Sequence, residues 1–329
     1  MTWYAANGYF DVEKLTRLHT PFVFVIGGRG TGKTFGALKY VRDAGIRFVY
    51  LRRTQTEIDL ISQPAYNPYK PITNDVKTQK LTKYTTAFVE SGETIGYAMA
   101  LSTIAHIRGF DASDIQIIIY DEFIPEPHAR PIKAEGSALL NCYETINRNR
   151  ELQGQQPVSM WCFANANRLN NPVFADLGLI DRVVRMQDKG ITEYTDSNRG
   201  ITIILLTGSP ISERKRNTAL YRLVHDTGFD AMALDNKLIT EGISIIGTRP
   251  IKEYKLLCQV GELCLYKHKS KQEYYVSTLR SGSAEVYTMI EADLMRFRRK
   301  YHWLLNAYLQ QHIVFESNQL EYILTDIVF

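Results

Sequence analysis

The sequence is poor in cysteine and contains no long apolar run. Its four cysteines, Cys142, Cys162, Cys258 and Cys264, form no CxxC pair, which favours buried free thiols over a zinc site or disulfides. No apolar stretch approaches the roughly 20 residues that a membrane-spanning helix needs, and no basic segment leads into an apolar core at the N-terminus. We therefore expect a soluble intracellular protein that has neither zinc nor disulfides and does not bind a membrane.

The sequence also lacks a strong excess of either charge. It carries 39 basic and 35 acidic residues, for a formal net charge of +4. A nucleic-acid partner cannot be argued from so small an excess, so such a partner would have to be bound by local basic clusters. With 329 residues, 45% of them hydrophobic, the chain is long enough for one large domain and a smaller one.

The first 190 residues predict an α/β domain. Short β-branched runs alternate there with longer segments of helical spacing, which is typical of a mostly parallel sheet covered by helices. We expect Thr85–Met99 to form a hairpin that turns at Ser91-Gly92 and lies outside the central sheet as an insertion. The expected central strands are Phe22–Ile26, Arg47–Leu51, Ile115–Tyr120, Met160–Ala164 and Arg182–Arg185.

The rest of the chain predicts a linker and a second domain. The composition turns polar around Lys189–Gly200 and a short helix is expected to open at Ser212–Arg216, so residues 191–229 are interpreted as a linker. Residues 230–329 predict a small α+β domain with a long helix over Ala292–Gln311. Its three expected antiparallel strands are Tyr254–Val260, Glu262–His268 and Glu273–Leu279.

The strongest motif is a phosphate-binding loop. Residues 27–34 read GGRGTGKT, a complete G-x-x-x-x-G-K-[ST] motif placed directly after an apolar strand and before a helical run. Lys33 is expected to reach the β- and γ-oxygens of ATP, and the Thr34 hydroxyl to ligate Mg²⁺. Arg29 is the unusual member, and solvent, the γ-phosphate and a neighbouring subunit are all open as its partner. The expected nucleotide-binding residues are Gly27, Gly28, Arg29, Gly30, Thr31, Gly32, Lys33 and Thr34.

An acidic pair follows a second apolar strand. Asp121 and Glu122 end the run that begins at Ile117, which is the Walker B arrangement. We expect Asp121 to hold Mg²⁺ through water, and Glu122 to orient or deprotonate the attacking water. Asn165 follows the strand Met160–Ala164, and it is either a sensor of the γ-phosphate or an ordinary turn former.

Two arginines are candidates for completing the site of a neighbouring subunit. Ring ATPases use such a cation because negative charge accumulates in the transition state. Arg148 follows a helix expected to begin near Glu135, where a cation would also offset the helix dipole. Arg108 is the second candidate, and its alternative is a solvated loop arginine.

Together these motifs resemble those of the DNA-packaging ATPases, or encapsidation proteins, of phi29-like podoviruses. The resemblance runs over nearly the whole chain and includes Tyr50–Arg53, Tyr120–Phe123, Ser137–Leu140, Arg148–Glu151, Asn165-Ala166, Asn171-Pro172 with Phe174, and Leu234–Asn236. It implies a P-loop NTPase core of the ASCE class, with an added strand and a conserved glutamate. It also implies that about five copies form a ring at the portal of an empty prohead in the host cytoplasm and translocate double-stranded DNA.

The resemblance further implies particular residue roles and partners. The arginine matching Arg148 acts in trans in that family, and the basic residue matching Arg108 has been considered for the same role. Some members need a packaging RNA, and no residue predicts whether this chain does. The C-terminal domain would be RNase H-like, and we expect it to be a vestigial nuclease because its first strand ends in Cys258–Val260 without an aspartate. Glu262, Glu285 and Asp293 keep nuclease activity open.

Two basic clusters are candidates for gripping DNA, because Lys and Arg neutralise backbone phosphates without reading sequence. Each could equally be a solvated helix face. The candidate residues are Arg214, Lys215, Arg216, Arg298, Arg299 and Lys300.

Three alternatives share the phosphate-binding loop. A helicase or phage-assembly motor would need strand separation or membrane association, and a non-hydrolysing nucleotide-binding protein would not need Asp121 and Glu122. A small-molecule kinase would need a lid that binds the phosphate acceptor. The sequence therefore favours a DNA-translocating ATP hydrolase.

Overall fold

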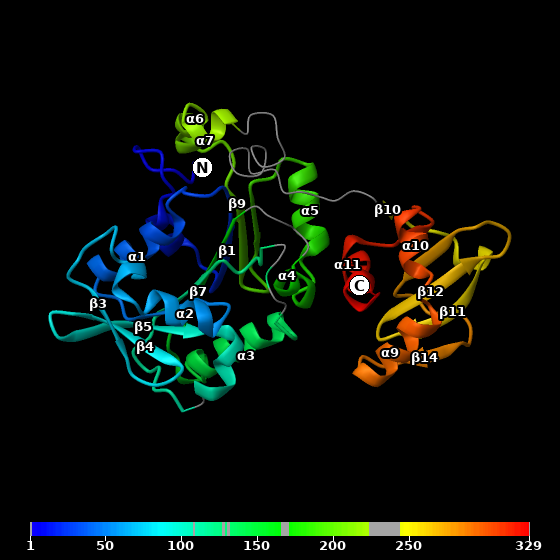
Figure 1. Cartoon of the computed structure of the whole chain (residues 1–329), viewed down its shortest axis with the longest axis horizontal. Coiled ribbons are helices and arrows are strands. Elements are labelled where there is room, and N and C mark those ends of the chain that lie inside the picture. The colour runs from blue at the N-terminus through cyan, green and yellow to red at the C-terminus, as the bar shows by residue number, and fades with distance from the viewer. Residues whose placement is uncertain are drawn as a thin grey trace. The chain divides into compact units, whose positions relative to one another are not determined.

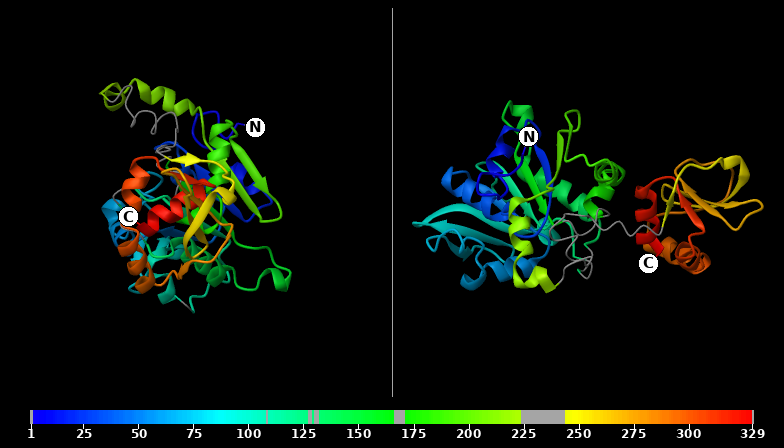
Figure 2. Two further views of the ribbon diagram at one scale, coloured as in Figure 1. Left: turned by 90° about the vertical axis from the view of Figure 1, so that its right-hand side faces the viewer. Right: turned by 90° about the horizontal axis from the view of Figure 1, so that it is seen from above.

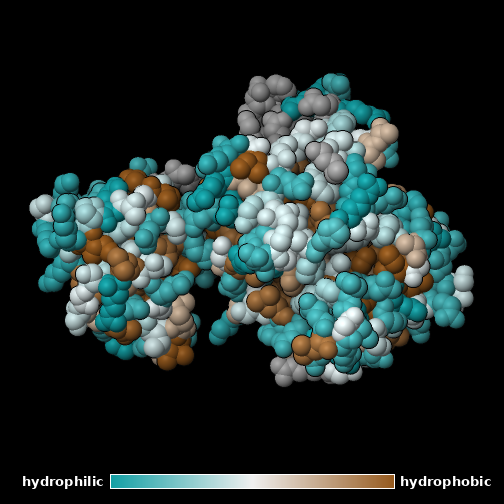
Figure 3. Space-filling model, turned by 180° about the vertical axis from the view of Figure 1, so that it is seen from behind, coloured by the Kyte–Doolittle hydropathy of each residue, from teal (hydrophilic) through white to brown (hydrophobic). Residues whose placement is uncertain are grey.

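The computed structural model describes residues 2–107, 109–126, 129, 132–165, 171–223 and 244–328. The chain divides into two compact units, one comprising Met1–Asp176 with Arg185–Ile239 and the other Leu177–Val184 with Thr240–Phe329. Among the described residues, no helix is both long and apolar enough to cross a membrane. The face of the molecule in Figure 3 is mostly hydrophilic in both units, with hydrophobic residues in small separate patches.

A nine-stranded sheet organises the first unit (Figure 1). Its order is β3-β4-β5-β2-β6-β7-β1-β9-β8, and the six strands from β5 to β9 in that order are parallel to one another. The expected mostly parallel α/β fold is therefore confirmed. The strands are β1 (Phe22–Ile26), β2 (Phe48–Arg52), β3 (Lys77–Lys80), β4 (Thr85–Glu90), β5 (Glu93–Ala100), β6 (Ile117–Asp121), β7 (Ser159–Ala164), β8 (Glu193–Asp196) and β9 (Ile201–Leu205).

The hairpin at Thr85–Met99 forms as β4 and β5, but it is not an insertion. Strand β5 pairs in parallel with β2, with Phe48 opposite Gly96. A side chain at Gly96 would collide with the Phe48 ring, so the absence of one lets that ring lie against the strand. The hairpin therefore extends the central sheet.

The expected strand at Arg182–Arg185 is absent, and the first part of the expected linker 191–229 forms two strands instead, while residues 224–229 lie outside the described part of the chain. Ile180–Asp188 is helix α5, because its buried residues Ile180, Val183 and Met186 recur every three positions rather than every two. The polar segment that follows forms the edge strand β8, which pairs with the fully buried β9. The large sheet thus continues to residue 205.

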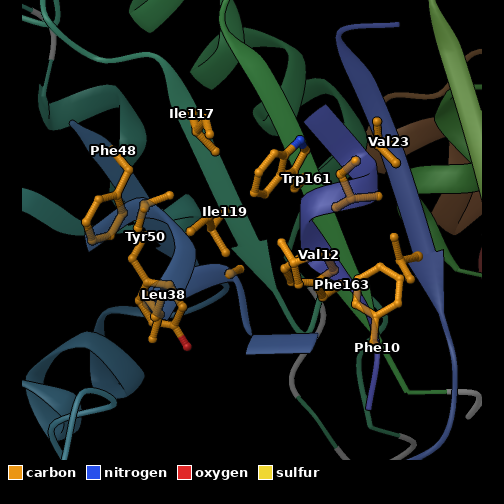
Figure 4. Close-up of a cluster of buried hydrophobic side chains, with 14 of the residues drawn as sticks. Phe10, Val12, Val23, Leu38, Phe48, Tyr50, Ile117, Ile119, Trp161 and Phe163 are labelled. Atoms are coloured by element: carbon orange, nitrogen blue, oxygen red, sulfur yellow. The ribbon is translucent and has the colours of Figure 1, made fainter. Parts of the chain in front are cut away.

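Helices cover both faces of this sheet (Figures 1 and 2). On one face, α1 and the N-terminal segment pack on strand residues two apart in sequence, as expected for side chains on one side of a strand. Figure 4 shows this cluster. It contains Phe10, Val12, Val23, Leu38, Phe48, Tyr50, Ile117, Ile119, Trp161 and Phe163. On the other face, Phe24 packs on Phe123 and Phe174 with ring centroids 5.5 and 5.4 Å apart.

The other elements of the first unit are mostly short. Its described helices are α1 (Lys33–Asp43), α2 (Gln55–Ile61), α3 (Glu135–Asn147), α4 (Pro172–Asp176), α6 (Pro210–Arg216) and α7 (Ala219–Leu223), while α5 (Ile180–Asp188) begins in a segment of the second unit and ends in the first. Its 3₁₀ helices are η1 (Val12–Arg17), η2 (Pro64–Tyr66), η3 (Leu101–Ile107) and η4 (Glu151–Gln153).

The second unit contains a six-stranded sheet in the order β10-β15-β13-β12-β11-β14. The expected antiparallel meander is present as β11, β12 and β13, and β14 and β15 flank it in parallel pairings. The likeness to RNase H stays a prediction. The elements are β10 (Ile245–Ile246), η5 (Ile251–Glu253), β11 (Tyr254–Val260), β12 (Leu263–His268), β13 (Tyr274–Ser277), β14 (Glu285–Tyr287), α9 (Glu291–Lys300), α10 (Leu304–Leu309), β15 (Ile313–Phe315) and α11 (Asn318–Val328).

The long helix expected over Ala292–Gln311 is two helices, α9 and α10. Two aromatic residues between them both contact the sheet: Tyr301 donates a hydrogen bond to Leu257 O, and Trp303 lies 4.4 Å from the Tyr274 ring. In a continuous helix these two side chains would point about 160° apart. Breaking the helix allows both to pack on the same sheet.

Candidate nucleotide-binding site

The phosphate-binding loop connects β1 to α1, as the sequence predicts. Gly30 and Gly32 adopt positive φ angles of 67° and 89°, a conformation that favours glycine. Gly32 is also the N-cap of α1, which begins at Lys33, so the amides of the loop and of the first helical turn converge. Such amides form an anion-binding site.

Lys33 lies buried inside the loop. Its ammonium donates hydrogen bonds of 3.0 Å to the carbonyl oxygens of Gly27 and Gly28. Burial lowers the pKa of Lys33 to about 8, against the opposing attraction of Asp121. A buried ammonium held mainly by neutral acceptors would gain from an anion in the adjacent cavity.

Thr34 and Asp121 lie together at the end of β6. The Thr34 hydroxyl donates to Asp121 Oδ1 at 2.8 Å, and the Tyr50 hydroxyl donates to Oδ2 at 2.8 Å. Burial, with the nearby Asp121 charge, raises the pKa of Tyr50 well above its usual value, so its hydroxyl remains a donor. A hydroxyl and a carboxylate oxygen side by side fit Mg²⁺, which prefers oxygen ligands and keeps most of its other positions for water and phosphate.

Glu122 is held by an arginine that the sequence analysis did not assign to the site. Arg52 lies 2.6 Å from Glu122, 3.2 Å from Asp121 and 2.8 Å from Glu57. Glu122 has a φ of 57°, which is unfavourable for a residue with a side chain. The signal for Arg52 was its position at the end of β2, since β2 and β6 are neighbours and parallel strands end at the same edge.

A cavity of about 380 Å³ joins these residues. Asn165 lines it at the end of β7, so the structure brings this predicted residue into the site. Phe35 also lines the cavity and was not predicted; it is an exposed aromatic residue one position after Thr34. The lining residues are Arg29, Gly30, Thr31, Gly32, Lys33, Thr34, Phe35, Asp121, Glu122, Ala164 and Asn165.

The predicted cations near the site have different partners. Arg29 forms an ion pair with Glu126. Arg148 is exposed at the end of α3, donates to Phe110 O at 2.7 Å and does not line the cavity of its own chain. Arg150 instead holds the loop before β6, since it donates hydrogen bonds of 2.6 Å to Ile115 O and 2.7 Å to Ala112 O. Arg108 lies outside the described residues.

The start of α3 is anchored to the end of β2 by a buried ion pair. Arg53 contacts both carboxylate oxygens of Glu135, at 2.6 and 2.8 Å, and Tyr120 donates to the same carboxylate at 3.1 Å. Glu135 has no exposed surface. This contact fixes the helix that carries Arg148 at its far end.

The candidate DNA-contacting residues of the second unit are partly engaged within α9 and its neighbours. Arg298 contacts Ile327 O at 2.6 Å and Glu291 at 2.8 Å, while Lys300 pairs with Glu285 at 2.7 Å. Arg299 is exposed, and among the described residues none forms an ion pair with it. Among those residues there is also no group of three or more His, Cys, Asp or Glu side chains placed to hold a metal ion.

This chain is similar to known proteins over most of its length. Residues 6–317 match the family model described as Podovirus DNA encapsidation protein (Gp16). The DNA packaging proteins of Bacillus phage PZA and Bacillus phage phi29 are each 26% identical over 328 residues, covering 94% of this chain and 93% of the relative.

Solved structures show the same fold. The phi-28 gp11 DNA packaging motor has a TM-score of 0.65 and 21% identity, over 98% of each chain. A chain of the bacteriophage phi-29 genome packaging motor assembly has a TM-score of 0.63 and 22% identity, over 97% of this chain and 98% of that one. The fold of both units is therefore shared with packaging motors.

Proposed function

Since the chain belongs to the podovirus DNA encapsidation protein family, we propose that it is the ATP-hydrolysing subunit of a motor that moves double-stranded viral DNA into a prohead. The observation that carries this proposal is the cavity in which Lys33, the Thr34–Asp121 pair and Glu122 meet. The motor would be a homo-oligomeric ring of about five copies, docked on the prohead portal in the host cytoplasm.

The phosphate-binding loop and the acidic pair have separate roles in hydrolysis. The loop amides and Lys33 bind the phosphates and offset their charge. Thr34 and Asp121 would hold Mg²⁺, which supplies charge neutralisation at the β- and γ-phosphates when bound. Asn165 lies at the same cavity and is positioned to hydrogen-bond the terminal phosphate or the attacking water.

Glu122 is the residue that orients and deprotonates the water. While it is paired with Arg52 at 2.6 Å, one of its oxygens is occupied by the guanidinium. The second oxygen is left to accept the proton of the attacking water, so the ion pair orients Glu122 while one of its oxygens acts as the base. Arg52 holds three carboxylates together at this edge of the sheet.

Arg148 is the arginine that we assign to the site of the neighbouring subunit. Its exposure, its position beyond the last turn of α3 and its absence from the cavity of its own chain support a role in trans. Its present partner is a neutral carbonyl oxygen, which a phosphate would replace with a stronger charge-assisted bond. Arg108 remains the second candidate.

For DNA contact we favour Arg214 and Arg299. Both are exposed, and within the described part of the chain neither forms an ion pair. Phosphate contacts from such residues are independent of sequence and weaken with added salt. Their removal should reduce the salt dependence of DNA binding.

The test of the proposed function is ATP turnover by the full chain, measured alone, with double-stranded DNA, and with DNA and empty proheads together. Strong joint stimulation supports the packaging motor. Stimulation by single-stranded DNA alone supports a helicase, and ATP binding without turnover under all conditions supports a nucleotide-binding structural protein. Lys33→Ala serves as the control that removes phosphate binding.

A further inference from the structure

Helix α6 reaches the phosphate-binding loop through Lys215. The Lys215 ammonium donates a hydrogen bond to Arg29 O, 186 residues away in sequence. It also lies against Gly30, where a side chain would collide with it. The approach follows from the sheet: β9 pairs in parallel with β1, so the segment after β9 emerges beside the loop after β1.

The charge of Lys215 has no counterion in the described part of the protein. The side chain is half-buried, burial lowers its pKa, and its acceptor is a neutral carbonyl oxygen. None of the described carboxylates forms an ion pair with it. The nearby cations differ, because Arg29 pairs with Glu126 and Arg52 with three acidic residues.

Lys215 also lies close enough to Lys33 for the two charges to interact. The Lys33 ammonium donates to the carbonyl oxygens of Gly27 and Gly28, and the Lys215 ammonium donates to the next carbonyl oxygen of the loop, that of Arg29. Two ammonium groups beside one loop repel each other and are partly desolvated, which is unfavourable unless an anion binds between them. Lys33 is the group that reaches the β- and γ-oxygens, and Lys215 lies against Arg29 and Gly30, which line the same cavity.

We propose that Lys215 binds the terminal phosphate of the nucleoside triphosphate and thereby makes α6 a part of the nucleotide site. This inference rests on the proposed nucleotide-binding function. On binding, the ammonium exchanges Arg29 O for a phosphate oxygen, so the position of α6 depends on whether the γ-phosphate is present. Lys215 is therefore a phosphate ligand in this assignment, and it leaves the set of DNA-contacting candidates.

The experiment compares the affinities of the full chain for ATPγS and ADP, measured by calorimetry with Mg²⁺ and without DNA. For Lys215→Ala we expect ATPγS to bind roughly 10- to 100-fold more weakly, the effect of losing one charge-assisted hydrogen bond. The affinity for ADP should change by less than about threefold. Lys215→Arg, which keeps the charge, should retain most of the preference for ATPγS.

The matched control is Arg222→Ala on the neighbouring helix α7, which removes an exposed cation of the same sign. It should leave both affinities unchanged. If Lys215→Ala fails to fold, Lys215→Gln keeps a donor for Arg29 O and supplies the same comparison. A structural role would weaken ADP and ATPγS together, so the ratio of the two affinities separates the two roles.

Equal losses for both nucleotides, or no loss for either, would overturn the assignment of Lys215. If the unaltered protein binds ATPγS and Lys33→Ala does not, the proposed function stands whatever Lys215 does. If the unaltered protein and Lys33→Ala both fail to bind any nucleotide, the proposed function itself is wrong and the role of Lys215 is overturned with it.

Discussion

The buried ion pair between Arg53 and Glu135 makes a quantitative prediction for Arg53→Met. The substitution leaves Glu135, which has no exposed surface, with the Tyr120 hydroxyl as a neutral donor. Breaking one partner of a buried pair costs about 3–5 kcal/mol, a large part of the roughly 5–15 kcal/mol that stabilises a typical protein. At about 2–4 °C per kcal/mol for a unit of this size, Tm should fall by roughly 6–20 °C.

The assay is thermal unfolding of the full chain followed by circular dichroism. Adding Glu135→Gln to Arg53→Met should recover part of the lost Tm, because burying a neutral amide costs less free energy than burying an unpaired carboxylate. The control is Lys80→Met, which removes an exposed pair with Asp59 of 3.0 Å and should shift Tm by no more than about 2 °C. A loss for Arg53→Met no larger than that of the control, or no recovery in the double variant, would refute the reasoning.

Three further predictions concern the nucleotide site. Glu122→Gln should keep ATP binding and reduce turnover by about 100-fold or more, since it removes the base that activates water; unchanged hydrolysis in a steady-state assay would take this role from Glu122. Arg148→Ala mixed with unaltered protein should lower turnover more than in proportion to its share, whereas a strictly proportional fall would contradict action in trans. Burial lowers the pKa of Lys33 to about 8, so the folded state binds fewer protons than the unfolded state above that pH, and stability should rise from about pH 8 towards the unfolded pKa near 10.4. Melting curves of Lys33→Met recorded at several pH values should lack this rise. If Tm depends on pH in the same way in both proteins, Lys33 is not the source of the rise.

The elements that were placed correctly from sequence are those with strong local signals. The loop at residues 27–34 needs only glycines, a lysine and a threonine between a strand and a helix, and the structure places it there. Asp121 and Glu122 end a run of apolar residues that is completely buried. The two helices over Ala292–Gln311 were merged because spacing alone does not show that Tyr301 and Trp303 must both face the sheet.

The errors near residues 85–99 and 182–205 share one physical origin. A hairpin has the same local pattern whether or not its second strand joins a larger sheet, and only the pairing of β5 with β2 decides that question. The pair of β-branched residues within Arg182–Arg185 suits a strand, and only the burial of Ile180, Val183 and Met186 on one side shows that the segment is a helix.

The amino-acid sequence by itself determined the chemistry of the loop and of the acidic pair, because these residues are neighbours along the chain and their spacing follows from the shape of a triphosphate. Only the tertiary structure decided which distant side chains join them. Arg52 reaches Glu122 and Lys215 reaches Arg29 because parallel strands bring their ends to one edge of the sheet, and that order of strands is set by burial of the whole core rather than by any local pattern.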